Sequence, residues 1–138
     1  METPSRDQLV EITRRFTDAF NRNDLDEVMA HFGDDIVYEQ FDGQVAEGRA
    51  DVRAALAPQF AGAFGVMRFD EEDCFVDADA RRALISWTCT LDDGQRARGW
   101  QGLDILHFTD DGLIQRKLTY GKAAKLALRP VARSSAGE

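Results

Sequence analysis

The sequence predicts an α+β fold in which three N-terminal helices pack on one face of a strongly curved, mainly antiparallel sheet. Apolar residues recur at helical spacing over residues 1–60, and strand-forming runs separated by turns follow from residue 66. The chain has 138 residues, 43% of them hydrophobic, so we expect one core in a single soluble domain over residues 1–126. Residues 127–138 have the composition of a flexible tail.

The first helix is indicated by a capping signal and a long apolar stripe. Ser5 followed by Gln8 resembles a capping box, which satisfies backbone donors at a helix N-terminus. The apolar residues that follow recur at intervals of three and four and therefore share one helical face: Leu9, Ile12, Phe16 and Phe20. We expect this helix to end near Asn21.

Two further helices are indicated by the same kinds of signal. Asp24 with Glu27 repeats the capping pattern, and Gly33 is expected to stop the second helix. Its apolar stripe consists of Leu25, Val28, Met29 and Phe32. A third helix is expected to start near Arg49, and Pro58 with the glycines that follow is expected to loosen its end.

Strands account for most of the remaining chain. Residues 35–41 are rich in β-formers and precede the turn signal Asp42-Gly43. From Val66 onward, runs of about ten residues alternate with turns rich in aspartate and glycine, which is typical of an antiparallel meander. These turns are Asp77-Ala78-Asp79, Asp92-Asp93-Gly94 and Asp110-Asp111-Gly112.

The charge distribution argues against nucleic acid and membranes as partners. The net charge is −8, and residues 1–121 alone hold 13 basic and 24 acidic residues. Such a field repels phosphate backbones and anionic lipid. No run approaches the ~18 apolar residues of a membrane span, and the first residues lack the pattern of a signal peptide, so we expect a cytoplasmic protein.

The cysteines and histidines show no metal-binding pattern. Cys74 and Cys89 form no CxxC pair, and their spacing to His31 and His107 matches no recognised ligand set. If Ala78 and Asp79 turn a hairpin, the two cysteines lie too far apart along their strands for a disulfide. We therefore expect free thiols, no metal and no cofactor.

Four segments resemble the nuclear transport factor 2-like superfamily, which includes ketosteroid isomerases, SnoaL-type polyketide cyclases and limonene epoxide hydrolase. They are FTDAFNRNDLDE at 16–27, HFGDDIVY at 31–38, EGRADVR at 47–53 and WQGLDILHFTDDGLI at 100–114. The resemblance covers about residues 6–122. It implies a cone-shaped half-barrel that encloses a ligand pocket. It also implies that the protein acts on small molecules without a cofactor and forms a homodimer through the outer face of the sheet. A shared fold does not by itself fix the chemistry.

Among the three signature positions of ketosteroid isomerases, this chain retains one. The resemblance places their protonated oxyanion-hole aspartate at Asp104. Their general-base aspartate corresponds to Gln40, whose neutral amide cannot abstract a proton. Their first-helix tyrosine corresponds to Phe16, whose ring cannot donate a hydrogen bond. The resemblance therefore does not imply standard steroid isomerisation.

The period of two along a strand predicts which side chains share the pocket with Asp104. On its own strand these are Trp100, Gly102, Leu106 and Phe108, and on the preceding strand Ile85, Trp87, Cys89 and Leu91. Lys117 or Thr119 lies opposite Asp104 if the intervening loop has two or four residues, and Leu118 if it has three. Tyr38 has the parity of Gln40, whereas His107 is expected on the outer face.

An acid in an apolar pocket either holds a proton or pairs with a cation. We therefore take Asp104, Lys117 and Tyr38 as candidate catalytic residues acting on a carbonyl, enol or epoxide compound. The candidate ligand-binding residues are Phe16, Phe20, Gln40, Trp87, Trp100, Leu106 and Thr119. Two alternatives remain open: a binding module without catalysis, and a dimerisation scaffold whose cone is filled by its own side chains.

Overall fold

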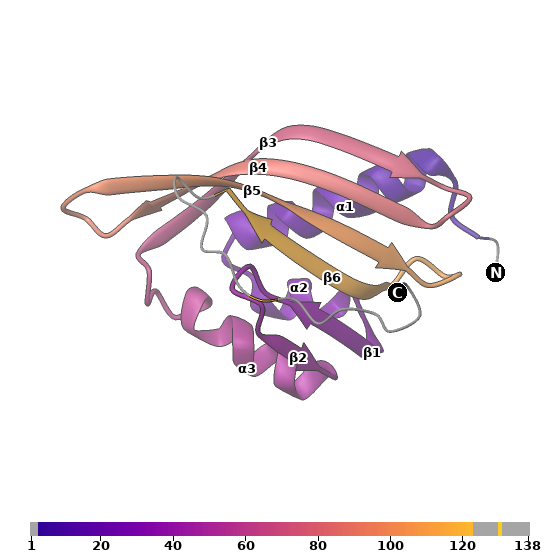
Figure 1. Ribbon diagram of the computed structural model, residues 1–138, viewed down its shortest axis with the longest axis horizontal. Helices are drawn as coiled ribbons and strands as arrows, with labels where there is room; N and C mark the ends of the chain where they lie inside the picture. The colour runs from indigo at the N-terminus through magenta and orange to yellow at the C-terminus, as the bar shows by residue number, and fades with distance from the viewer. Residues whose placement is uncertain (1–2, 123–129, 131–138) are drawn as a thin grey trace.

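The computed structural model describes residues 3–122 and residue 130, and it has the predicted α+β architecture (Figure 1). Its elements in chain order are α1 (Arg6–Asn21), α2 (Leu25–Ala30), β1 (Phe32–Glu39), β2 (Val45–Glu47), α3 (Arg49–Phe60), β3 (Val66–Asp77), β4 (Arg82–Asp92), β5 (Ala97–Phe108) and β6 (Ile114–Gly121). The domain boundary at residue 126 and the tail expected at 127–138 lie outside the described residues, Pro130 excepted.

The strands form one sheet in the order β2-β1-β6-β5-β4-β3. Strands β3 to β6 make the predicted antiparallel meander, and β1 pairs with β6 in parallel. Figure 1 shows these long strands bending over α1, while α3 lies beside β1 and β2. The concave face of the sheet is therefore covered by helices. In the part of the chain that is described, no helix is both long and apolar enough to cross a membrane.

The capping signals act as predicted. Gln8 N donates to Ser5 Oγ at 3.2 Å, and Ser5 N donates to Gln8 Oε1 at 2.8 Å, which completes the capping box of α1. Glu27 N donates to the Asp24 side chain at 3.0 Å at the start of α2. Each bond satisfies a backbone or side-chain group at a helix end that would otherwise lack a partner.

The expected end of the second helix was wrong. Helix α2 ends at Ala30 with His31 as C-cap, and Phe32 and Gly33 already belong to β1. The cause is a long-range pairing, because Ile114 N donates to the His31 carbonyl at 2.7 Å and Phe32 lies opposite Ile114. Local helical spacing cannot reveal such a partner.

The third helix ends where it was expected. Helix α3 stops at Phe60, two residues after Pro58, because the missing N–H of a proline in the last turn removes only one helical bond. The short strand β2 was not predicted; it pairs with β1 through the turn at Asp42 and Gly43. Three residues are too few to show an alternating pattern.

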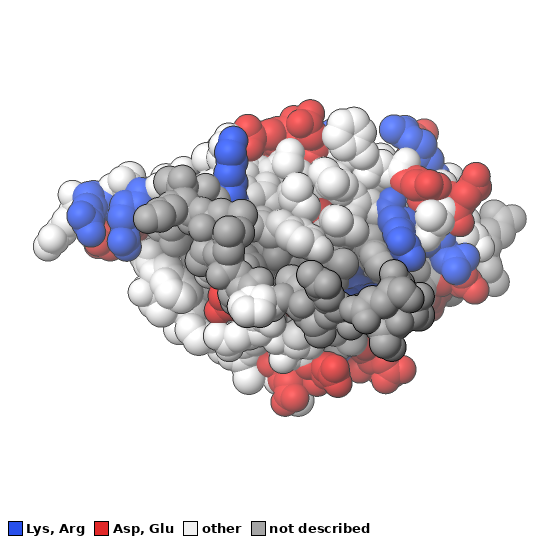
Figure 2. All heavy atoms as spheres, viewed as in Figure 1, with Lys and Arg blue, Asp and Glu red and all other residues white. Residues whose placement is uncertain are grey.

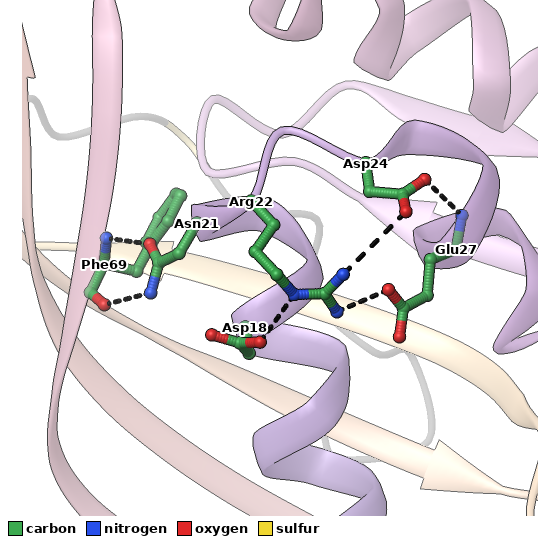
Figure 3. A network of polar contacts seen from close by, with 6 residues as sticks. All are labelled: Asp18, Asn21, Arg22, Asp24, Glu27 and Phe69. Carbon is green, nitrogen blue, oxygen red and sulfur yellow. Dashed lines mark hydrogen bonds and ion pairs between the residues drawn. The ribbon is translucent and has the colours of Figure 1, made fainter.

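Side-chain contacts from the middle and the C-terminal end of α1 fasten it to the edge strand β3. The Asn21 amide donates to the Phe69 carbonyl at 2.8 Å and accepts from the Phe69 N–H at 2.7 Å, as Figure 3 shows. In the middle of the helix, Arg14 donates two hydrogen bonds of 2.9 Å to the Glu71 carboxylate. These contacts fix the helix over the concave face and cover part of an exposed sheet edge.

The two cysteines are free, as expected. Cys74 lies opposite Ile85 and Cys89 opposite Phe69 in the pairing of β3 with β4. Burial raises the pKa of the Cys89 thiol to about 11, so this side chain behaves as a small apolar core residue.

Candidate functional site

A cavity of about 370 Å³ lies between the concave face of the sheet and helices α1 and α3. This volume is in the range of small-molecule sites. The cone is therefore not filled by its own side chains. Aromatic side chains make up much of its wall: Phe20, Tyr38, Phe69, Trp87 and Trp100.

The cavity floor is a hydrogen-bonded network of Asp104, Lys117, Thr119 and Trp87. Lys117 Nζ donates to Asp104 Oδ1 at 3.1 Å and to Thr119 Oγ1 at 2.7 Å. Thr119 Oγ1 donates to the same carboxylate oxygen at 2.5 Å. Trp87 Nε1 donates to Asp104 Oδ2 at 3.2 Å. The carboxyl group thus accepts three hydrogen bonds, one of them from a cation, as expected for a carboxylate.

The register of β5 and β6 creates this network. Asp104 lies directly opposite Thr119, and Leu106 lies opposite Lys117, so both polar residues of β6 point to the same face as the acid. Loop length alone did not predict this register. The turn pairs Phe108 with Ile114, a register that would bring Leu118 opposite Asp104, and a register shift between His107 and Phe108 places Thr119 there. A slip of one residue would have brought Leu118 there instead.

Lys117 is a buried cation, only 4% exposed. Burial by itself lowers the pKa of its amine, but the neighbouring Asp104 carboxylate and Tyr38 outweigh burial and hold the pKa above its ordinary value. The ammonium nitrogen also lies 4.3 Å from the centre of the Tyr38 ring, a cation–π contact. The floor therefore carries a fixed positive group beside a fixed negative one.

Trp87 is positioned by a glycine. A Cβ atom on Gly102 would lie 2.6 Å from Cη2 of the Trp87 indole and equally close to a backbone oxygen, so only glycine lets the indole lie against β5. The ring also packs edge-on against Phe69 and Trp100, with centroid distances of 4.9 and 5.0 Å. Strand parity predicted that Trp87 faces the cavity, but not that its N–H reaches Asp104.

The structure brings most of the candidate residues together. The following line the cavity: Phe20, Tyr38, Gln40, Trp87, Trp100, Asp104, Lys117 and Thr119. Phe16 and Leu106 do not line it. Phe16 lies one helical turn before Phe20 on α1 and packs against His31 and Phe32. Leu106 is fully buried in the hydrophobic core.

Sequence reasoning missed about half of the cavity lining, including Phe41, Gln59 and Phe64. Gln59 has a recognisable signal, because it falls three and four residues after apolar positions of α3 and so lies on the helix face turned toward the sheet. Phe41 and Phe64 lie in connections, where no periodicity applies.

The histidines and acidic residues add no second centre within the described part of the chain. His107 lies outside the cavity lining, and burial together with Arg82 and Arg116 lowers its pKa. His31 lies beside Phe16, where burial lowers its pKa. Among the described residues, no group of three or more histidine, cysteine, aspartate or glutamate side chains is arranged to hold a metal ion.

A curved, unclosed sheet with helices over its concave face is the cone fold of nuclear transport factor 2-like proteins. Residues 13–117 match the family model of the SnoaL-like domain, and the chain belongs to this family. No curated protein matches the sequence at a significant level.

Several solved structures share the fold. An NTF2-like protein of unknown function from Mesorhizobium loti is 26% identical, with a TM-score of 0.71 over 87% of this chain and 97% of that protein. SalBIII, described as an epoxide hydrolase/cyclase-like enzyme in pyran ring formation of salinomycin, is 16% identical, with a TM-score of 0.74 over 84% and 92%. A putative polyketide cyclase from Xanthomonas campestris is 20% identical, with a TM-score of 0.69 over 83% and 90%.

Proposed function

We propose that the protein is an enzyme that acts, without a cofactor, on a small apolar carbonyl, enol or epoxide compound bound in the cavity. The observation that carries this proposal is the buried pair of Asp104 and Lys117 at the floor of an otherwise largely apolar, aromatic cavity. Burying two charges is costly, and the pair lies where a ligand would meet it.

Lys117 is the group we assign to the ligand oxygen. An ammonium group has three N–H donors, and the described residues Asp104 and Thr119 accept two of them. The ammonium also contacts Tyr38, and we assign its remaining donor to a carbonyl or epoxide oxygen that enters beside that ring. When negative charge develops on that oxygen, a fixed cation in a dry cavity stabilises it far more than water would.

Asp104 is the group we assign to proton transfer. Its Oδ2 atom accepts only from Trp87 among the described residues and retains an acceptor position. This oxygen is placed to take a proton from the carbon next to a ligand carbonyl, while Lys117 holds the enolate oxygen. Return of the proton to another carbon would complete an isomerisation. With an epoxide, the same carboxylate would take a proton from the attacking water as the ring C–O bond breaks, and the alkoxide formed beside Lys117 would then receive that proton.

The named relatives are compatible with this chemistry. SalBIII is described as epoxide hydrolase/cyclase-like and the Xanthomonas protein as a putative polyketide cyclase. Epoxide opening and cyclisation both require proton transfer at or next to a carbon–oxygen bond. At these identities the likeness extends to the fold, so the assignment for this chain depends on its own cavity floor.

One observation favours a second function, a binding module without catalysis. Among the described residues, no buried side-chain nitrogen or oxygen lacks a hydrogen-bond partner, so the floor is already a satisfied network. Gln40 and Phe16 also stand where the isomerases carry their base and their tyrosine. Such a module would retain an apolar ligand and release it chemically unchanged.

The experiment that separates the two functions is proton exchange in heavy water. A ketone bound next to an active base exchanges its α-protons for deuterium, which proton NMR detects without knowledge of the natural substrate. We expect the wild type to accelerate exchange and the double variant Asp104→Asn/Lys117→Met to be slower by about 10²-fold or more. Equal rates for both proteins would contradict the enzymatic proposal, and unchanged ligand with tight binding would support the binding module.

We also propose that the protein forms a homodimer through its outer sheet face. Leu84, Ile105 and Leu118 lie side by side across β4, β5 and β6 there, and Phe75 and Tyr120 are 64% and 55% exposed. Where described atoms are visible in the middle of Figure 2, the surface is largely uncharged. Such a patch is typical of an interface. Light scattering of the purified chain tests it: a monomeric mass at micromolar concentration would contradict the proposal.

A further inference from the structure

Two phenylalanines of the cavity lining are largely exposed to solvent. Phe41 is 62% exposed and Phe64 is 52% exposed, whereas the floor residues are nearly buried. A single exposed apolar residue on a protein surface needs no explanation. Here both residues belong to the same cavity, so they mark the place where it opens to solvent.

Each of these two phenylalanines is held on a glycine-containing connection. Phe41 lies in the turn between β1 and β2, which Gly43 closes at φ 88°, and its ring is 5.2 Å from that of Trp100. Phe64 lies between Gly62 and Gly65, both at positive φ. A Cβ on Gly65 would lie 2.3 Å from a backbone oxygen of β4, so this connection is seated closely against the sheet. The two rings are therefore placed by their backbones.

We propose that the ligand is longer than the enclosed cavity and that Phe41 and Phe64 are specificity-determining residues for its tail. This inference rests on the proposed function: the ligand oxygen lies at Lys117, and an apolar chain leaves the cavity across the two rings. The continuity of the rings with the cavity is the reason to assign them to the ligand. Covering them removes apolar surface from water, which stabilises the complex in proportion to the area covered.

The charge at the opening further defines the tail. Asp42 lines the cavity beside Phe41, and residues 1–121 carry an excess of acidic over basic residues. An anionic tail end would be repelled there. The ligand class that fits is a neutral carbonyl compound with a long apolar chain, not a fatty acid whose carboxylate would lie at the opening.

A homologous series of methyl ketones from 2-hexanone to 2-decanone tests the inference by isothermal titration calorimetry. Each buried methylene should tighten binding to the wild type by about fourfold. The double variant Phe41→Ala/Phe64→Ala should bind short ketones with the affinity of the wild type. For longer ketones, its affinity should no longer increase with each added methylene. Val45→Ala is the control, because Val45 is 52% exposed but neither lines the cavity nor belongs to the proposed interface.

The same gain per methylene in wild type and double variant, at every chain length, would overturn the inference. The same loss in Val45→Ala would also overturn it. The variant Asp104→Asn/Lys117→Met separates this result from the proposed function, because it should weaken all ketones by a common factor without changing the gain per methylene. Ketone affinity that is indifferent to this variant would contradict the proposed function, whatever the length dependence shows. The charge prediction is tested with 9-oxodecanoate, which has a methyl ketone at one end and a carboxylate at the other: it should bind more weakly than 2-decanone, and equal or tighter binding would contradict the neutral tail.

Discussion

Breaking the ion pair at the cavity floor is the most direct test of the structure. Asp104 is 7% exposed and Lys117 is 4% exposed, with 3.1 Å between Oδ1 and Nζ. At an effective dielectric constant of about 20, two unit charges at this separation attract by about 5 kcal/mol. Removing one partner leaves the other charge buried and uncompensated, so we expect Asp104→Asn to lower the free energy of unfolding by about 3–5 kcal/mol. Lys117→Met should cost a similar amount.

Urea unfolding followed by circular dichroism measures these changes. The double variant Asp104→Asn/Lys117→Met should lose less stability than either single variant, because no unpaired charge remains. Asp26→Asn is the control, since the ion pair of Asp26 with Arg53 is exposed and should contribute less than about 1 kcal/mol. Single variants that cost less than about 1 kcal/mol would show that water reaches the pair and would refute the dry cavity floor.

Three further outcomes follow from individual contacts. Gly102→Ala should displace the Trp87 indole and lower the free energy of unfolding by about 1–3 kcal/mol, with a red shift of tryptophan emission as its readout. Asn21→Ala removes two hydrogen bonds to the Phe69 backbone and should cost about 1–2 kcal/mol, with faster hydrogen exchange at the Phe69 amide; an unchanged exchange rate would count against this contact. Because the folded state raises the pKa of Lys117, its stabilising contribution is complete below pH 10.5 and is lost as the pH rises further. A pH series of urea unfolding should show this loss in the wild type and not in Lys117→Met.

The sequence predicted the elements that depend on near neighbours. The capping box at Ser5 and Gln8 and the aspartate-glycine turns between the long strands were all found where they were expected. Strand parity also placed Asp104 and Trp87 on one face, because alternation depends only on the backbone of each strand. The apolar cone and the acid at its floor, Asp104, were therefore accessible before the structure.

The failures share a cause, which is dependence on a distant partner. Phe32 was assigned to a helix because its pairing with Ile114, more than 80 residues away, leaves no local trace. Phe16 was expected at the cavity, but which turn of α1 reaches it depends on how the helix lies across the sheet. Phe64 had no periodicity that connects it with the site.

By itself, the sequence determined the succession of helices and strands and the inward direction of Asp104, because these follow from contacts within a few residues. Only the tertiary structure decided that this acid meets Lys117, Thr119 and Trp87, and that the cavity stays open. The physical reason is register: hydrogen bonding between strands far apart in the chain sets which side chains face each other, and one residue of slip exchanges a polar floor for an apolar one.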